Sequence, residues 1–439
     1  MTAERDRVLA DTDRDRVVDL LRVVALGAVV LGHWLLPVIV TVDGEPFVRL
    51  LVHEAEWTRP ATWVFQVMPV FFIVGGWANA RAWQRAQGRG ETAVAWAGRR
   101  ARRLLRPLVP LVAAWAVAVA LGQALGIESR WLTLASQSAL VPAWFLAVYV
   151  VVTVAVPVTV RLDARVGLLV PLVLVALVAV ADALTAAGLE AAQWTSFVWA
   201  WFAIHQLGLI WHRRGLPGPL AGLALLVGGL VVLLGLVTVL GYPVDMVVEV
   251  DGRTNATPPS LAMPTLAVAW LGVIALIHRP AGRLLARDRP WLLVALAGSR
   301  IMTVFLWHLT ALVVLAAVLV ATGVVPVVEP LSGAWWALRP VWILGCALVL
   351  AVLVALLGRL EGPPRQAPAT PPGPVGLTVG AWLAAGTIGL LAAEGVHDPQ
   401  GPLGVALLPL VGLLAALAAL GVLEPDHRNR DAPSRAGRT

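Results

Sequence analysis

Residues 17–40 read VVDLLRVVALGAVVLGHWLLPVIV, an apolar run long enough to cross a bilayer as a helix. Arg22 and His33 are its basic side chains, with ten residues between them, and Asp19 falls near the same stripe. Eleven helical steps of about 100° each return to within about 20° of the starting direction, so Arg22 and His33 share one face. His33 then lies about 16 Å further along the axis. A histidine near mid-bilayer is costly and predicts a functional site.

The composition places the chain among polytopic membrane proteins. It has 439 residues, of which 59% are hydrophobic and 13% charged, and soluble domains do not need so many apolar residues. The single cysteine, Cys346, excludes an internal disulfide and a cysteine-rich metal site. All 33 basic residues are arginine, which is typical of a GC-rich genome.

Twelve apolar segments predict an all-α protein of about twelve transmembrane helices. They are residues 17–40, 64–83, 104–125, 143–160, 166–188, 194–212, 218–241, 261–278, 298–322, 340–358, 376–394 and 403–423. With the N-terminus in the cytoplasm, inner segments hold 28 of the 33 arginines and outer segments hold five. This asymmetry predicts a multi-pass protein of the inner (plasma) membrane with both termini cytoplasmic.

The predicted organisation has five parts: a cytoplasmic tail (1–16), a ten-helix core (17–360), a Pro-rich linker (361–375), a two-helix hairpin (376–423) and a basic cytoplasmic tail (424–439). The first span lacks a small-residue cleavage pattern, so we expect a retained helix. The net charge of +7 comes from arginines in interhelical loops, which favours membrane orientation and not nucleic-acid binding.

Two loops on the predicted outer side are long and carry several acids. Residues 242–260 contain paired prolines, which favour either an ordered cap or an ordinary surface loop. Residues 41–63 include His53, Glu54 and Glu56, which either engage a sugar acceptor or belong to a solvated loop.

Six segments, in order, make the chain resemble the membrane acyltransferase 3 family, which includes O-antigen and other cell-envelope O-acetylases; the chain is similar to an actinobacterial-type member. The segments are VVDLLRVVALGAVVLGHW (17–34), MPVFFIVGGWANARAW (68–83), RRARRLLRPLVP (99–110), PAWFLAVYV (142–150), HQLGLIWHRRG (205–215) and SRIMTVFLWH (299–308). The resemblance covers roughly residues 15–360. Gly75-Gly76 replaces the usual Ser-Gly, and Phe305 stands where the family has tyrosine.

The resemblance implies transfer of an acetyl or short acyl group from a cytosolic acyl-CoA to a hydroxyl of an envelope glycan or lipid. His33 is the predicted general base, because neutral imidazole has a pKa of about 6.5. Arg22 is expected to hold a donor phosphate or to pair with Asp19, and His308 to hold the acceptor or stabilise an oxyanion. We expect no permanently bound cofactor and no metal.

Other segments supply the remaining predicted site residues. Arg100 and Arg103 are predicted to bind donor phosphates, and Gly75 and Gly76 to allow close helix approach or passage of the thioester tail. Trp144 and Phe145 are predicted to line a substrate pocket, and His205 to bind substrate or only to hydrogen-bond between helices.

The expected partners are the lipid bilayer, acyl-CoA and the acceptor, and the oligomeric state stays open. A secondary transporter of a small solute is the alternative, although no repeated halves are evident. A noncatalytic envelope scaffold is the second alternative, but it would give no reason for polar residues such as His33, His308 and Arg22 to persist within the membrane.

Overall fold

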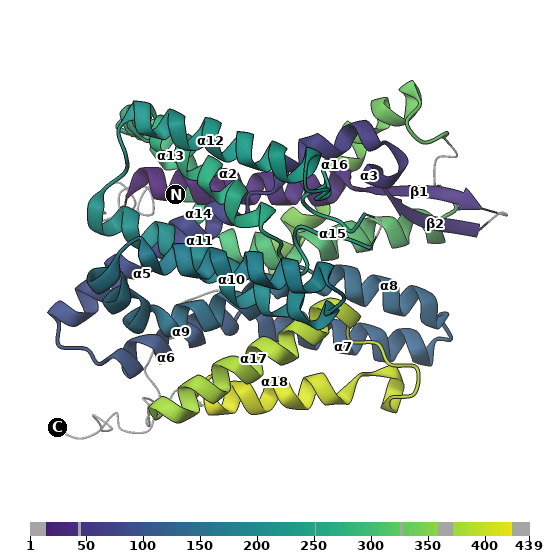
Figure 1. Cartoon of the computed structure of the whole chain (residues 1–439). Helices are drawn as coiled ribbons and strands as arrows, with labels where there is room; N and C mark the ends of the chain where they lie inside the picture. The colour runs from purple at the N-terminus through teal and green to yellow at the C-terminus, as the bar shows by residue number, and fades with distance from the viewer. Residues whose placement is uncertain (1–14, 43–44, 251, 325–327, 359–371, 424–439) are drawn as a thin grey trace, which may run out of the picture. The chain divides into compact units, whose positions relative to one another are not determined.

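The computed structural model describes residues 15–42, 45–250, 252–324, 328–358 and 372–423 (Figure 1). The predicted tail 424–439, nearly all of the tail 1–16 and most of the linker 361–375 lie outside these residues. In the described part, helices predominate and the only sheet has two strands.

A helix lies at each of the twelve predicted spans. These helices are α2 (Arg16–Leu35), α5 (Met68–Gly88), α7 (Leu108–Ala124), α9 (Ala143–Val166), α10 (Leu169–Ala186), α11 (Ser196–Arg214), α12 (Pro219–Thr238), α13 (Ala262–Leu285), α15 (Ile301–Ala321), α16 (Gly333–Leu357), α17 (Pro374–Glu394) and α18 (Leu407–Ala419). By length and composition, ten segments of the described chain are able to cross a membrane; α11 and the shorter α18 are the two spans outside this set. The prediction of a polytopic all-α membrane protein is confirmed.

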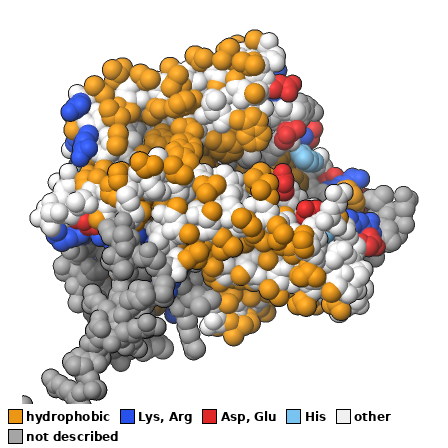
Figure 2. Space-filling view, turned by 90° about the horizontal axis from the view of Figure 1, so that it is seen from below, with side chains coloured by type: hydrophobic (Ala, Val, Ile, Leu, Met, Phe, Trp, Pro, Cys, Tyr) orange, Lys and Arg blue, Asp and Glu red, His pale blue; other side chains and the backbone are white. Residues whose placement is uncertain are grey.

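Shorter elements lie between the spans. They are β1 (Pro37–Val42), β2 (Glu45–Leu50), α3 (Leu51–Glu54), η1 (Glu56–Ala61), α4 (Thr62–Phe65), α6 (Ala93–Leu105), α8 (Ser129–Leu140), η2 (Glu190–Thr195), α14 (Asp288–Gly298) and η4 (Pro402–Gly404). In the coloured part of Figure 2, hydrophobic side chains are spread over much of the surface, and most charged side chains lie toward two opposite sides.

The first helix is shorter than its apolar run predicts. Asp15 caps its start, because its Oδ1 accepts from the amides of Val17 and Val18 at 3.1 Å each. The helix ends at Leu35 and not at residue 40, since Pro37 has no amide hydrogen to continue it and β-branched residues follow. Residues 37–42 instead form β1, which pairs antiparallel with β2 (Figure 1). His33 therefore lies in the last turn of α2, nearer the helix end than the apolar run 17–40 predicts.

The chain divides into two compact units. The first contains residues 1–84 and 158–357, and the second contains residues 85–157 and 358–439. In the first unit, the arginine-rich end is where α2 begins and α5, α11 and α13 end. There Arg16 donates to the carbonyl of Leu285 at 2.7 Å, and His212 lies 3.0 Å from Gln84. The opposite end, where α2 ends and β1 and β2 lie, is called the hairpin end below.

The second unit joins the C-terminal helices α17 and α18 to α6, α7 and α8. The amide of Gln137 on α8 donates to the carbonyl of Ala393 at 2.5 Å, and Thr133 lies 2.8 Å from Nδ1 of His397. The C-terminal helices are therefore fixed to α8 by polar contacts as well as by apolar packing.

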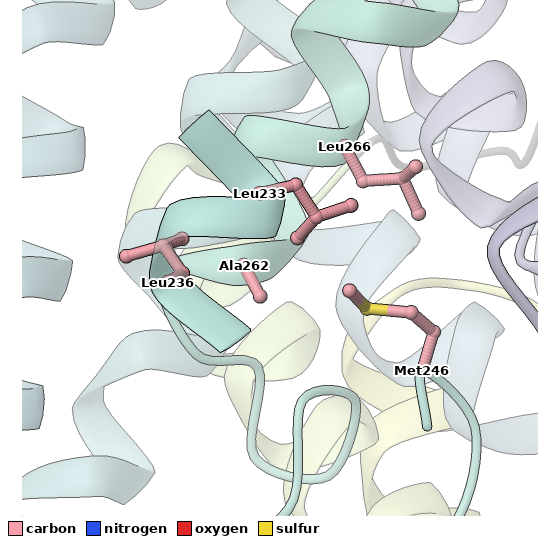
Figure 3. Packing of buried hydrophobic residues seen from close by; sticks show 5 residues of the cluster. All are labelled: Leu233, Leu236, Met246, Ala262 and Leu266. Atoms are coloured by element: carbon pink, nitrogen blue, oxygen red, sulfur yellow. The ribbon is translucent and has the colours of Figure 1, made fainter. Parts of the chain in front are cut away.

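Residues 242–250 and 252–260 form an ordered cap at the hairpin end of the first unit. The Trp63 indole donates to the carbonyl of Val244, and the Gln66 amide donates to that of Met246, both at 2.7 Å. The Met246 side chain packs into a buried apolar cluster with residues of α12 and α13 (Figure 3). The other members of this cluster are Leu233, Leu236, Ala262 and Leu266. Of the two readings of this loop, the structure supports the ordered cap.

Candidate active site

Two histidines from distant helices meet in the first unit. His33 comes from the last turn of α2, and His308 is the eighth residue of α15. Nδ1 of His33 lies 2.8 Å from Nε2 of His308, and the rings stack with centroids 5.1 Å apart and planes at 14°. The structure thus brings together two residues that the sequence named as separate candidates.

The hydrogen bonds of this pair determine where its protons lie when both rings are neutral. Nδ1 of His308 is 2.7 Å from the carbonyl oxygen of Phe305, which only accepts, so Nδ1 carries the hydrogen. Nε2 of His308 is then the acceptor for the Nδ1–H group of His33. A neutral imidazole has one hydrogen on nitrogen, so Nε2 of His33 carries a free lone pair. That lone pair is what a general base needs.

The two residues differ in exposure. His308 is fully buried, whereas His33 is partly exposed. Trp34, next to His33, donates its indole N–H to the His308 carbonyl at 3.0 Å, and Trp342 donates to the Trp34 carbonyl at 2.9 Å. These bonds fix the end of α2 against α15 and α16. His33 is therefore held in place while part of its surface stays reachable.

Arg22 pairs with Asp19 on the same helix. Their Nη1 and Oδ1 atoms are 3.3 Å apart, and the side chains are 34% and 13% exposed. The carboxylate neutralises the guanidinium only in part, because the geometry is a single contact and not a bidentate one. Arg22 still presents a third of its surface, and it lies about 16 Å along α2 from His33.

Arg300 is a second cation near Arg22 that the sequence reasoning did not select. Residues 288–298, which the sequence assigned to an inner loop, form α14, and α14 packs beside α2. Arg16 lies 5.1 Å above the Trp291 ring, and a Cβ at Gly298 would lie 3.8 Å from Val23. Arg300 follows two residues later and is exposed. The apolar stretch WLLVALAG at 291–298 is the signal that would have found this helix.

The arginines of α6 lie in the second unit and have different surroundings. Arg100 lies with its guanidinium 5.8 Å from the Trp96 ring centre, and Arg103 is exposed. Arg99 forms an ion pair with Glu91. Arg102 is buried and donates to the carbonyl of Leu420, at the end of α18, at 3.4 Å. The arginine cluster therefore includes a structural member, Arg102, beside the two predicted donor-binding residues.

Gly76 permits a close crossing of α5 and α11. A Cβ there would overlap the carbonyl oxygen of His205, and one at Gly208 would overlap that of Ile73. Gly75 is buried on the same helix. Close helix approach, one of the two roles expected for this glycine pair, is what the structure shows at Gly76.

His205 and the aromatic candidates occupy packed positions. Nε2 of His205 lies 3.3 Å from Nδ2 of Asn79, and both side chains are buried between α11 and α5. In the second unit, Trp144 meets Phe145 edge to face at 6.5 Å, and Phe145 stacks on Tyr149 at 4.9 Å. These contacts give His205 an interhelical hydrogen bond and place Trp144 at one end of an aromatic row, where it is half-buried.

Among the described residues, no group of three or more His, Cys, Asp or Glu side chains is placed to hold a metal ion. A family model described as an acyltransferase domain matches residues 15–359, which is most of the chain. The comparisons with curated proteins and with solved structures give no match.

Proposed function

Since the chain belongs to the membrane acyltransferase 3 family, we propose that it moves an acetyl or short acyl group from acyl-CoA to a hydroxyl of an envelope glycan or lipid, with His33 as general base. The observation that carries the proposal is the histidine pair, in which His308 directs the Nε2 lone pair of His33 away from the pair. The family match covers both residues. It gives no support to the transporter alternative.

In the proposed step, Nε2 of His33 takes the proton of the acceptor hydroxyl as its oxygen attacks the thioester carbonyl carbon. The new carbon–oxygen bond forms, the carbon–sulfur bond breaks, and the thiolate receives the proton from the His33 imidazolium. The products are the acylated acceptor and free coenzyme A. During the step, Nε2 of His308 stabilises the imidazolium through the Nδ1–H group of His33.

The geometry favours a positioning role for His308. Its Nδ1 is bound to the Phe305 carbonyl and its Nε2 to His33, so neither nitrogen is left to donate to an oxyanion. In this proposal His308 therefore supports the base. This role replaces the two expected ones, which were to hold the acceptor or to stabilise an oxyanion.

The donor is proposed to enter from the arginine-rich end of the first unit. The arginine distribution predicts that this end faces the cytosol, where acyl-CoA is made. Arg22 is partly exposed there, Arg300 follows α14, which packs against α2, and both are cations suited to phosphate oxygens. Arg100 and Arg103 of the second unit remain proposed donor-binding residues, and Trp144 and Phe145 remain proposed pocket residues.

The test is acyl transfer by purified protein in lipid nanodiscs, with radiolabelled acetyl-CoA and an envelope extract as acceptor. His33→Ala is expected to lower kcat by about 10²- to 10⁴-fold, the usual contribution of a general base. His278→Ala is the matched control, because His278 of α13 is a partly exposed histidine of the same unit and meets the Trp211 ring edge to face at 5.9 Å. A His33→Ala protein that folds normally and keeps the wild-type rate would refute the assignment. Solute exchange across liposomes without acyl transfer would favour the transporter.

A further inference from the structure

Two tryptophans form an exposed aromatic surface at the hairpin end of the first unit. Trp57 of η1 is 72% exposed and Trp336 of α16 is 37% exposed, although their sequence positions are far apart. Their ring centres are 6.3 Å apart and their planes are tilted by 47°. The pair therefore offers two adjoining aromatic faces, which we call the tryptophan platform.

Charged side chains border the platform. Glu56 precedes Trp57 in the chain, is 76% exposed, and pairs with Arg59 at 3.0 Å. Arg49 pairs with Glu54 at 3.2 Å on the neighbouring segment. So exposed a carboxylate indicates that this surface contacts water or lipid head groups and not hydrocarbon. A ligand for it needs an apolar face to lie on the rings and hydroxyls to meet the ions, and a sugar ring has both.

Contacts connect the platform to the histidine pair. Trp336 packs edge to face on Trp335 at 4.7 Å, and the Arg339 guanidinium lies 3.6 Å from the centre of the Trp335 ring. Arg339 then donates to the Pro37 carbonyl at 3.0 Å, just beyond α2. The first two contacts lie within α16, and the third joins α16 to the residue that follows the end of α2, so the platform and His33 are held by one framework.

The helix α16 also gives the separation, along its own axis, between the tryptophan platform and His33. Trp342 bonds to the carbonyl of Trp34, the residue after His33, and it follows Trp336 by six positions. At 1.5 Å per residue, the platform is about 9 Å along α16 from the level of the base. A sugar on the platform would therefore lie close to His33 along the axis of α16.

We propose that Trp57 and Trp336 form the surface on which a sugar ring of the acceptor binds. The inference rests on the proposed acyl transfer and adds an acceptor-binding surface to it. Arg339 is a positioning residue that fixes Trp335, and with it the platform, relative to α2.

The experiment measures KM separately for acceptor and donor with the full-length protein in nanodiscs. The acceptor probes are envelope polysaccharide stripped of esters by mild alkali and, in a parallel reaction, sugar-free envelope phospholipid. Trp57→Ala and Trp336→Ala are each expected to raise the KM for polysaccharide by about tenfold and to leave the KM for acetyl-CoA unchanged. Trp57→Phe, which keeps a ring, is expected to recover most of the loss.

Trp194→Ala is the matched control, because Trp194 of η2 is 59% exposed and stacks on Phe197 without contacting the platform. If exposed tryptophans at this end only anchor the protein in the interface, all three alanine variants will behave alike, which would overturn the inference. Acylation of the phospholipid alone would also overturn it while leaving acyl transfer intact. If the wild type acylates neither probe and releases no coenzyme A, the proposed function itself fails.

Discussion

Nδ1 of His33 lies 2.8 Å from Nε2 of His308, although 275 positions separate the two residues in the chain. Neither residue is oriented by its own helix alone. The carbonyl of Phe305 sets the protonation of His308, and His308 in turn sets that of His33. The proposed base and the residue that orients it therefore form one hydrogen-bonded pair made from α2 and α15.

Removal of the orienting ring is expected to lower kcat more than KM. In His308→Ala the His33 ring loses the acceptor for its Nδ1–H group, and a misplaced catalytic group costs about 10²-fold in rate. His308→Gln keeps an oxygen able to accept that hydrogen bond and should retain more activity. Steady-state kinetics with acetyl-CoA and the ester-stripped polysaccharide measures kcat and KM for both variants. Equal activity of the two variants would contradict the orienting role.

Alanine at the crossing of α5 and α11 is expected to destabilise the first unit. In Gly208→Ala, the new Cβ would overlap the backbone carbonyl of Ile73, which has no flexible side chain to move aside. Overpacking of this kind costs about 1–3 kcal/mol, and here the helices must separate. Gly228→Ala in α12 is the control, because a Cβ there meets nothing within 4 Å. Thermal unfolding in nanodiscs should show a lower Tm for Gly208→Ala only; matching values would disprove the close crossing.

Substitutions of two neighbouring arginines of α6 are expected to have different effects, one on stability and the other on donor binding. Arg102→Met removes the hydrogen bond to the Leu420 carbonyl and should destabilise the second unit by about 1–3 kcal/mol. Arg103→Met alters an exposed side chain, so its Tm should stay near that of the wild type. If Arg103 binds the donor, its variant should instead raise the KM for acetyl-CoA. The reverse pattern, a stable Arg102→Met and an unstable Arg103→Met, would contradict this division.

A buried carboxyl in the cap is expected to make stability depend on pH. Burial raises the pKa of Asp245 above its ordinary value of 3.8. Hydrogen bonds from the backbone amides of Val248 and Val247 and the nearby cations Arg59 and His53 oppose the shift. A folded-state pKa above the unfolded value means that the folded form holds its proton more tightly. The stabilisation from this group is thus complete below pH 3.8 and is lost as pH rises through the folded pKa.

Asp245→Asn removes that dependence and keeps an oxygen for the two amides. We expect the Tm of the variant relative to the wild type to rise as pH increases from about 4 to about 8. Thermal unfolding across that range measures the difference. A constant or falling difference would show that the carboxyl ionises freely in the folded protein.

Local sequence determined the spans, because a bilayer requires an apolar run of set length and each such run can be recognised in the sequence without knowledge of its neighbours. The helices from α9 to α13 begin within a few residues of their predicted starts. The pairing of Arg22 with Asp19 also followed from helical spacing, since residues three apart are neighbours on one helix.

The sequence also named His33 and His308 as candidates, but only tertiary structure decided that the two rings meet. Which rings touch depends on how α2 and α15 pack, and hydrogen positions depend on a carbonyl, that of Phe305, which no motif encodes. The early end of α2 depended on residues 37–42 finding β2 as a partner, which apolar length alone does not reveal. Contacts within one helix are fixed by its periodicity, whereas contacts between helices are fixed by packing, and the candidate site is made of the second kind.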